Sequence, residues 1–370
     1  MTLLLNNADV ARVLSIDRTI AALEQAYRDL ATENAVCRPR IDIRIPTGEA
    51  DRLYQWGTME GGSATSGYFA IRAKSDVVYE REYNGVRTQE KYCVQPGSYC
   101  GLILLFSVRN GEPLAILNDG YLQHLRVGAD SAIGVKLAAR DDAQVLGMLG
   151  SGGMARSHVA AISRVRNLRR LQVWSPTPEH RRAYAEEMAE QYGLDAVAVD
   201  DPREVYRGAD LICGCTDSAG EVIAGEFLEP GTHVTCIGGR PDARTYERLD
   251  AWLRLGTASA PWRHPEQRAV DEIIAYHAQP NSTVYAGHQH SQGSRNLPRE
   301  GSSTRVVYLA DVLAGRAEAR ASADEITYSE RGNIQGAQFF AVAGAAYEEA
   351  RRHGVGRELP TDWLLQDIRD

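Results

Sequence analysis

The feature that most constrains the fold is an apolar run at 145–149 that leads directly into a glycine-rich turn. The turn has the spacing G-x-G-x-x-A and is formed by Gly150, Gly152 and Ala155. In a phosphate-binding turn the first glycine permits the sharp bend, the second lets the backbone approach a pyrophosphate, and the small third residue keeps helix and strand close. The next helix then aims its free N–H groups at the phosphates. The turn predicts a dinucleotide-binding site, and the alternative is a glycine turn of some other α/β fold.

Downstream of the turn, short apolar runs alternate with helical segments. Strands are expected at 171–174, 196–199, 211–215 and 232–237, and helices at 154–164, 178–192 and 202–207. This alternation is typical of an α/β fold with a doubly wound parallel sheet, the Rossmann arrangement. We therefore expect the dinucleotide to contact the glycine turn and the ends of later strands, at Gly150, Ser151, Gly152, Gly153, Met154, Ala155, Thr216, Ile237 and Gly238.

The end of the second strand bears on which dinucleotide is bound. A site that prefers NAD usually carries Asp or Glu there, roughly 20 residues past the glycines, to bind the ribose 2′-hydroxyl. Here Ser175 holds that position, and Thr177, Arg181 and Arg182 follow it. A missing carboxylate and nearby arginines favour a 2′-phosphate. We expect NADP, with NAD as the alternative if both arginines are merely solvated on a helix face.

Length and charge agree with an ordinary soluble enzyme. A chain of 370 residues suggests two domains, and its formal net charge of −8 argues against nucleic acid or an anionic membrane as the main partner. No apolar stretch approaches the ~20 residues of a membrane span, and the N-terminus lacks the cationic flank of a signal peptide. The six cysteines are scattered without a C-x-x-C pair. We expect a reduced, cytoplasmic protein.

Two other regions have a residue pattern that differs from the alternating strands and helices downstream of the glycine turn. A helix is expected at 17–32, with Ser15 or Asp17 as its N-cap, and the chain from 41 to about 117 is rich in strands and turns. Residues 257–303 are polar and rich in Gly, Pro, Ser and His, so we expect an irregular excursion there. The spacing of His277, His288 and His290 matches no compact ligand motif, so no metal site is expected.

The chain as a whole resembles the ornithine cyclodeaminase/μ-crystallin family. The resemblance lies in an ordered series of segments, at 38–40, 111–120, 125–131, the glycine turn, 228–233 and 309–316. It implies a substrate-binding and dimerisation domain (1–125 plus 325–370) with a Rossmann domain (126–324) inserted in it. It also implies a homodimer and NAD(P) chemistry on α-amino or α-imino acids.

Arginines in two of these segments are similar to the family's carboxylate binders. They are Arg40, in R-P-R, and Arg126, in L-R-V-G-A. Such chemistry needs the substrate carboxylate pinned, and the planar fork of Arg matches a carboxylate bidentately. The family's basic residue between them corresponds to Arg72 or Lys74, with Arg72 fitting the register better. For each arginine a surface ion pair is the alternative.

Two departures from the family bear on the reaction. Cyclodeaminases carry a Glu near the position of Gln55 and an Asp at the position of Arg240. A cyclisation needs such carboxylates to hold a distal ammonium and move its proton, and neither Gln nor Arg can do so. Asp242 could substitute for the missing Asp. We therefore name Arg72, Lys74 and Asp242 as catalytic candidates, and Arg40, Gln55, Arg126 and Arg240 as substrate contacts.

The departures favour plain hydride transfer between NAD(P)H and the imine of a 2-oxo acid, or its reverse. The alternatives are a cyclodeamination with recycled cofactor and a μ-crystallin-like protein that binds NADPH and a ligand without turnover. If Arg240, Arg40, Arg126 and Arg72 or Lys74 all face the pocket, their charge exceeds what one carboxylate requires. On that premise an acidic imino acid is expected as substrate.

Overall fold

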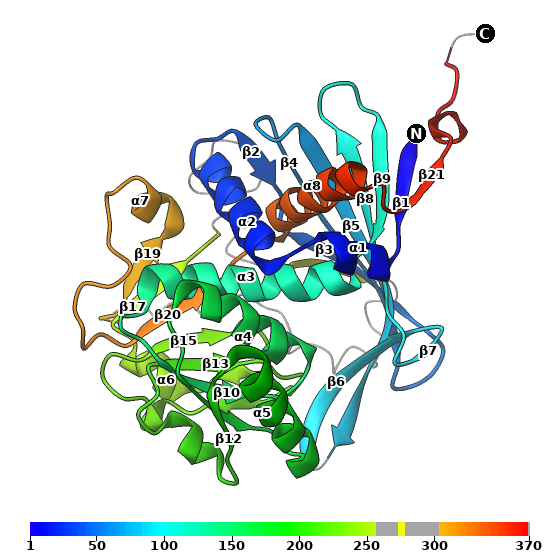
Figure 1. Ribbon diagram of the computed structural model, residues 1–370. Helices are drawn as coiled ribbons and strands as arrows, with labels where there is room; N and C mark the ends of the chain where they lie inside the picture. Colours follow the sequence, from blue (N-terminus) through cyan, green and yellow to red (C-terminus); the bar gives the residue numbers. More distant parts are fainter. Residues whose placement is uncertain (84, 257–272, 278–302, 369–370) are drawn as a thin grey trace.

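The computed structural model describes residues 1–83, 85–256, 273–277 and 303–368, and it builds the chain around two large sheets (Figure 1). One sheet has eleven strands and the other has eight. Helix α3 (Gly120–Ala138) lies between the parts formed by the two sheets (Figure 1). The α/β class predicted from the sequence is confirmed.

The eleven-stranded sheet is built mainly from the first third of the chain. Its long path runs β18-β3-β4-β5-β8-β9-β1-β21. Helices α2 (Ile16–Ala31) and α8 (Gln335–His353) cover one face, with α1 (Asn7–Val13) near its edge (Figure 1). Ser15 caps α2, as predicted. The strands are β1 (Thr2–Leu5), β2 (Ala35–Cys37), β3 (Arg40–Pro46), β4 (Leu53–Ser63), β5 (Tyr68–Tyr83), β6 (Val86–Cys93), β7 (Gln95–Pro96), β8 (Cys100–Ser107), β9 (Pro113–Asn118), β18 (Ile273–His277) and β21 (Arg357–Leu359).

The eight-stranded sheet has the predicted doubly wound form. Its order is β12-β11-β10-β13-β15-β20-β17-β19, and all of its strand pairs are parallel. The strands are β10 (Val145–Leu149), β11 (Arg170–Trp174), β12 (Asp195–Ala198), β13 (Leu211–Gly214), β15 (His233–Cys236), β17 (Ala251–Arg254), β19 (Arg305–Tyr308) and β20 (Thr327–Glu330). The helices are α4 (Gly153–Val165), α5 (Pro178–Tyr192), α6 (Ala243–Arg248) and α7 (Leu309–Leu313). The small elements in this part of the chain are β14 (Glu221–Ile223), β16 (Arg240–Pro241) and 3-10 helices at Pro202–Tyr206 and Gly225–Phe227. A further 3-10 helix, Thr361–Leu364, follows β21 of the other sheet.

The sheets do not divide the chain at the expected boundaries. Residue 126 lies within α3, β18 pairs with β3 of the first sheet, and β20 pairs with β15 and β17 of the second. The β6 strand also reaches the second sheet's loops, because Gln89 N donates to Asp217 O (3.2 Å) and Ala219 N to Arg87 O (2.9 Å). The division into domains stays a prediction. None of the described helices is long and apolar enough to cross a membrane.

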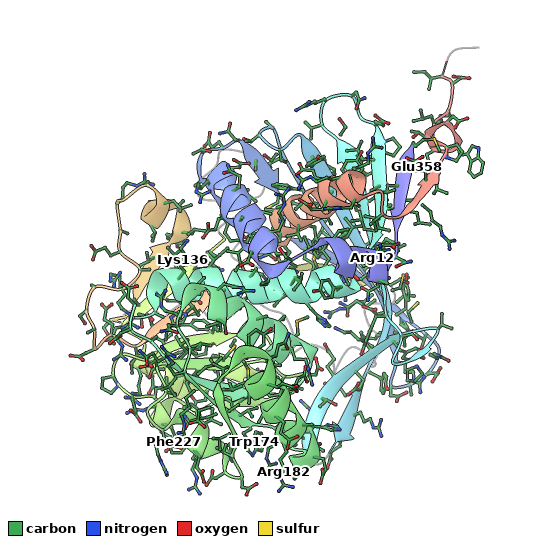
Figure 2. All side chains as sticks on the ribbon, viewed as in Figure 1. Arg12, Lys136, Trp174, Arg182, Phe227 and Glu358 are labelled. Carbon is green, nitrogen blue, oxygen red and sulfur yellow. The ribbon has the colours of Figure 1, made fainter. Side chains whose placement is uncertain are left out.

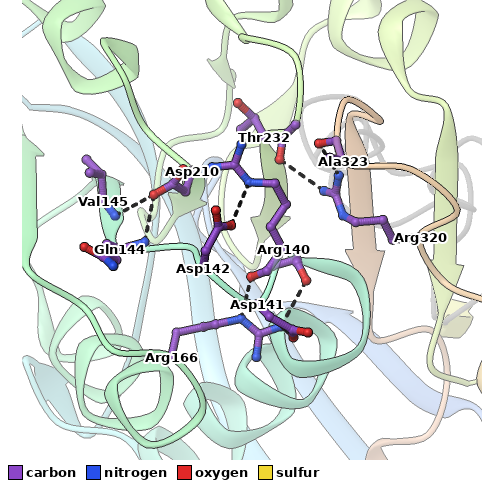
Figure 3. A network of polar contacts seen from close by, with 12 residues as sticks. Arg140, Asp141, Asp142, Gln144, Val145, Arg166, Asp210, Thr232, Arg320 and Ala323 are labelled. Carbon is purple, nitrogen blue, oxygen red and sulfur yellow. Dashed lines mark hydrogen bonds and ion pairs between the residues drawn. The ribbon is translucent and has the colours of Figure 1, made fainter.

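The C-terminal end of α3 is anchored to the eight-stranded sheet by arginines (Figure 3). Arg166 donates to the carbonyls of Val135 (3.0 Å) and Ala139 (2.9 Å), and so satisfies acceptors at the end of the helix. Arg140 pairs with Asp210, whose carboxylate also accepts the N–H of Val145 at the start of β10 (2.9 Å). The helix that carries Arg126 is thereby held against the strand that leads into the glycine turn.

Two fully buried histidines on or beside the eight-stranded sheet make stability depend on pH. Burial lowers the pKa of His158 from 6.5 to about 4 and that of His233 from 6.5 to about 3. Below about pH 6.5 the unfolded chain binds protons that the folded protein excludes, so stability falls with falling pH. We expect each histidine to contribute a loss of roughly 1.4 kcal/mol per pH unit in that window. Urea unfolding from pH 7.5 to 5 measures how steeply the free energy of unfolding falls with pH. His233→Asn should make this slope shallower. An unaltered slope in that variant would show that His233 does not contribute to it.

Candidate functional site

One face of the eleven-stranded sheet carries charged side chains that face α3 and α8. Alternate residues of a strand share a face, so Arg72, Lys74 and Asp76 of β5 lie on the same side. The register places Gly57 of β4 opposite Lys74. A Cβ at Gly57 would lie 2.6 Å from Lys74 Cε and 2.6 Å from an oxygen of Asp42. The glycine therefore makes room for charged groups to approach each other inside the protein.

Two of the predicted arginines in this site are neutralised by carboxylates. Arg40 makes a bidentate pair with Asp42, with N–O distances of 2.7 and 2.9 Å, and Asp42 also accepts a bond from Gln55 Nε2 (2.6 Å). Arg72 Nε donates to Asp119 Oδ2 at 2.6 Å. Arg40 and Arg72 thus form ion pairs, although inside the protein and not at its surface, and their role toward the substrate stays a prediction.

Lys74 lies between opposing charges and is largely buried. Its Nζ is 3.4 Å from Asp76 Oδ2, and 11% of its side chain is exposed. Burial lowers the pKa of Lys74 well below 10.5, and the charge of Arg40 lowers it further, against the opposing effect of Asp42 and Asp76. An amine with a lowered pKa gives up its proton more readily than an ordinary lysine.

Arg126 projects from α3 and is held by amides instead of carboxylates. Its Nη1 donates to Gln338 Oε1 (2.6 Å), and its Nε and Nη2 donate to Gln123 Oε1 (3.1 and 2.8 Å). The guanidinium lies 4.9 Å from the centre of the Phe339 ring, and only 3% of the residue is exposed. Burial lowers the pKa of Arg126 well below its usual value, with contributions from the like charges of Arg331 and Arg72. Within the described ranges, no carboxylate lies at ion-pair distance from it.

A second layer of polar groups supports Gln338. Its Nε2 donates to the hydroxyl of Tyr27 (2.8 Å), and that hydroxyl donates to Asp130. Both Tyr27 and Asp130 are buried, and burial raises the pKa of each. The chain of hydrogen bonds from Asp130 to Arg126 therefore crosses from α3 through α2 to α8 and back.

The glycine turn brings the predicted dinucleotide residues together at the carboxyl ends of three parallel strands. A Cβ at Gly150, whose φ is +119°, would lie 2.0 Å from Cys215 O. A Cβ at Gly238 would lie 1.8 Å from Thr216 O. In contrast, a Cβ at Gly152 would meet nothing within 4 Å, and α4 begins there without a side-chain cap. The space beside Gly152 is therefore open at the start of a helix, as a turn that binds a pyrophosphate requires.

Further predicted residues of the turn have structural contacts. Ala155 is fully buried against the sheet. The ring of His124, on α3, lies 3.0 Å from the Cβ position of Gly153. Met154 O accepts from Ser157 Oγ (2.9 Å), and Ile237 follows the end of β15 beside Gly238. Because α3 carries both His124 and Arg126, one helix links the dinucleotide turn to the arginine site.

The end of β11 is polar, as predicted, but its first arginine is already engaged. Ser151 Oγ donates to Ser175 Oγ at 2.9 Å. Arg181 donates to Ser175 O (3.0 Å) and pairs with Asp200, while Arg182 is exposed on α5 (Figure 2). Thr177 is the N-cap residue of α5 and makes no side-chain cap bond. Arg181 therefore shapes the end of the strand, and Arg182 is the arginine whose charge faces solvent.

Asp242 and Arg240 do not join the charged face. An oxygen of Asp242 accepts from Thr245 N (2.6 Å) and Gly225 N (3.0 Å), so this carboxylate caps α6. The structure thus gives Asp242 a capping role, and its catalytic role stays a prediction. Arg240 is exposed on β16, which pairs with β14. Among the described residues it makes no ion pair, neither with Asp242 nor with another acid.

Several residues of the site were missed by sequence reasoning. Gln123, Gln338 and Tyr27 belong to no motif, and Asp119 and Asp130 lie in the segments 111–120 and 125–131 that carry the family resemblance but were not singled out there. Only the three-dimensional contacts unite these residues. The sequence does hold a signal for Gln338, which is a polar residue within the alanine-rich segment that forms α8. The structure shows that this residue is fully buried.

Among the described residues, His158, Cys213 and Cys215 form a buried group whose potential ligand atoms lie within 4.8 Å of one another. Both nitrogens of His158 already have partners, Met154 O at 2.7 Å and Ser131 Oγ at 3.0 Å. We therefore interpret these three side chains as part of the packed interior. Of the excursion's histidines, His288 and His290 and the side chain of His277 lie outside the described part.

Comparisons with known proteins agree with this geometry. The sequence profile of the ornithine cyclodeaminase/mu-crystallin family matches residues 73–352. The chain is 28% identical over 357 residues to a putative dehydrogenase of Rhizobium meliloti, covering 95% of this chain and 97% of the relative. It is 28% identical over 264 residues to a Delta(1)-pyrroline-2-carboxylate reductase of Bacillus cereus, covering 70% and 74%. The structure of the Thermococcus litoralis reductase of that name, in complex with NADH and L-proline, superposes with a TM-score of 0.72 at 22% identity, covering 97% of this chain and 100% of the other.

Proposed function

The chain belongs to the ornithine cyclodeaminase/mu-crystallin family, and from that premise we propose that it is an enzyme that transfers a hydride between a nicotinamide dinucleotide and an α-imino or α-amino acid. The observation that carries the proposal is the buried guanidinium of Arg126, which has no described carboxylate at ion-pair distance, although the negative charge of Asp130 on the same helix partly offsets its own. It lies on the same helix as His124, whose ring contacts the glycine turn. When bound, the nicotinamide supplies or accepts the hydride at the substrate Cα.

Arg126 binds the substrate carboxylate in this proposal. Its planar fork matches a carboxylate, and its contact with the Phe339 ring and two glutamines fixes the plane of the guanidinium. Pinning one end of a small substrate fixes the path between its Cα and the hydride carrier. Arg72, neutralised by Asp119, lies 5.5 Å from the centre of the same ring.

Lys74 is the proposed proton donor and acceptor for the substrate nitrogen. Burial and the charge of Arg40 lower the pKa of its amine, which favours proton transfer to the substrate nitrogen, whereas Asp242 caps a helix. Gln55 supports the pair of Arg40 and Asp42 by its bond to Asp42. We keep Arg40 as a substrate-site residue that acts with Asp42 as a neutral unit.

For the cofactor we propose NADP, with NAD as the alternative. The support for NADP is the absence of a carboxylate at Ser175 and the exposed charge of Arg182. Against it stands the engagement of Arg181 with Ser175 O and Asp200. A ratio of kcat/KM for the two cofactors decides between them.

The assay that tests the function follows nicotinamide absorbance and ammonia together. The substrates are cyclic imino acids, 2-oxo acids with ammonium, and ornithine, each with NADPH and with NADH. We expect consumption of the reduced cofactor in equal amount to the amino acid formed. Ammonia released from ornithine with no net change in cofactor would instead establish the cyclodeaminase alternative. Tight NADPH binding without turnover of any substrate would establish the ligand-binding alternative.

We also propose that the chain forms a homodimer through the outer face of the eleven-stranded sheet, with the dinucleotide-binding unit apart from that interface. This face, opposite the charged one, exposes large apolar side chains. Ile43 and Ile45 are each 41% exposed and Leu102 is 43% exposed. A large apolar patch on an otherwise charged protein is typical of an interface. All six cysteines are free thiols, which supports the proposed cytoplasmic location.

Leu102→Arg is expected to convert the dimer to monomers at micromolar concentration. A charge placed in the centre of an apolar interface would be left without a partner when buried, which costs several kcal/mol. Sedimentation velocity measures the mass of each variant. Leu313→Arg, which adds the same charge at a 41% exposed leucine on α7, is the control. A Leu102→Arg protein that stays dimeric would place the interface elsewhere.

A further inference from the structure

The cations around the charged face differ in what neutralises them. Arg40 is paired with Asp42, Arg72 with Asp119, and Lys74 lies 3.4 Å from Asp76. Arg126 instead donates its hydrogen bonds, among the described residues, to the neutral amide oxygens of Gln123 and Gln338. Amide oxygens satisfy the N–H donors of a guanidinium without cancelling its charge. The charge of Arg126 is therefore left for a ligand.

The orientation of the Gln338 amide is set by its other partner. The Tyr27 hydroxyl donates to Asp130, so it accepts from Gln338 Nε2 at 2.8 Å. That bond turns Oε1 toward Arg126 Nη1, 2.6 Å away. The reversed amide would present N–H donors to a guanidinium that has only donors, and both groups would lose a bond inside a buried region.

We infer that Gln338 is a positioning residue that holds Arg126, which has no carboxylate at ion-pair distance among the described residues, ready to bind the carboxylate of the substrate. This inference rests on the proposed function and deepens it. The expectation of an acidic substrate stays a prediction, although two of the cations on which it was based have carboxylate partners. Arg40 and Arg72 are paired, and Arg240 is exposed on β16.

The critical variant is Gln338→Glu, which has nearly the same shape and adds the missing negative charge. A carboxylate at this position would pair with Arg126 and compete with the carboxylate of a ligand. We expect the preference for an amino acid over the corresponding amino-acid amide to fall roughly 10- to 100-fold. Gln338→Met removes the acceptor but leaves the charge of Arg126, so its preference should stay within about 3-fold of wild type even where both affinities fall.

The readout is binding of the amino acid and of its amide to the protein loaded with dinucleotide, measured by calorimetry. A ratio of two affinities is insensitive to the fraction of protein that is folded, and it needs no turnover. An unchanged ratio in Gln338→Glu would overturn the role of Gln338. Failure of the proposed function is a separate result, since it would appear as wild-type protein that binds the amino acid but transfers no hydride.

Discussion

Arg126→Ala is expected to lower kcat/KM roughly 10- to 150-fold, the effect of losing a charge-assisted contact to the substrate carboxylate. Dinucleotide binding should stay nearly intact, because the turn contacts α3 through His124 and not through Arg126. Steady-state kinetics and NADPH fluorescence titration measure the two effects separately. Gln123 and Gln338 lose their charged partner in this variant, so thermal unfolding is recorded alongside.

Arg12→Ala is the matched control for this experiment. Arg12 is an exposed arginine on α1 (Figure 2), so its removal tests for a general effect of losing one positive charge. We expect its kinetics to equal those of wild type. If Arg126→Ala also kept wild-type kinetics, Arg126 would be removed from the substrate site.

Lys74→Met is expected to lower kcat for imine reduction by roughly 10²- to 10⁴-fold, the usual contribution of a positioned proton donor. Burial and the charge of Arg40 lower the pKa of Lys74, so the protonated amine is present only below that lowered value. The rate of reduction by wild type should therefore fall as pH rises through it, on the acid side of an ordinary lysine. Met has a similar length, and its loss of charge removes the donor.

The pH profile is the decisive readout for Lys74. In Lys74→Met the descending limb should be absent, and what activity remains should vary little with pH. Lys136→Met makes the same substitution at an exposed residue on α3, and it should keep the wild-type profile. A Lys74→Met enzyme with the wild-type limb would assign that titration to another group.

The fold could be predicted from the sequence because its signals are local. The apolar run before Gly150 became β10, and the alternating segments after it became the parallel sheet. The strand-rich part was recognised, but the strands that lie across the expected boundaries were not. β18 and β20 depend on pairing between distant segments, which no local pattern reveals.

The site could be predicted only in part, because charge pairing is a property of register and packing. Arg126 was found through its segment, but the neutral amide that faces it comes from residue 338, more than half the chain away. Asp42 lies two residues from Arg40 on the same face of β3, so that pair is local, whereas Asp119 reaches Arg72 from 47 residues away. Gly57 and Gly101 leave room for the two carboxylates. The sequence shows which residues are charged, but it does not show which of them form neutralising ion pairs.

Hydride transfer to the substrate Cα is the central claim, and labelled cofactor tests it most directly. The protein is incubated with NADPH carrying deuterium at the transferring position of the nicotinamide ring and with an imino acid of one carboxylate, and the amino acid formed is analysed by mass spectrometry. The account predicts one deuterium at Cα for each cofactor oxidised, and loss of this product in Arg126→Ala. Product without deuterium at Cα, or formed without net oxidation of the cofactor, would contradict it.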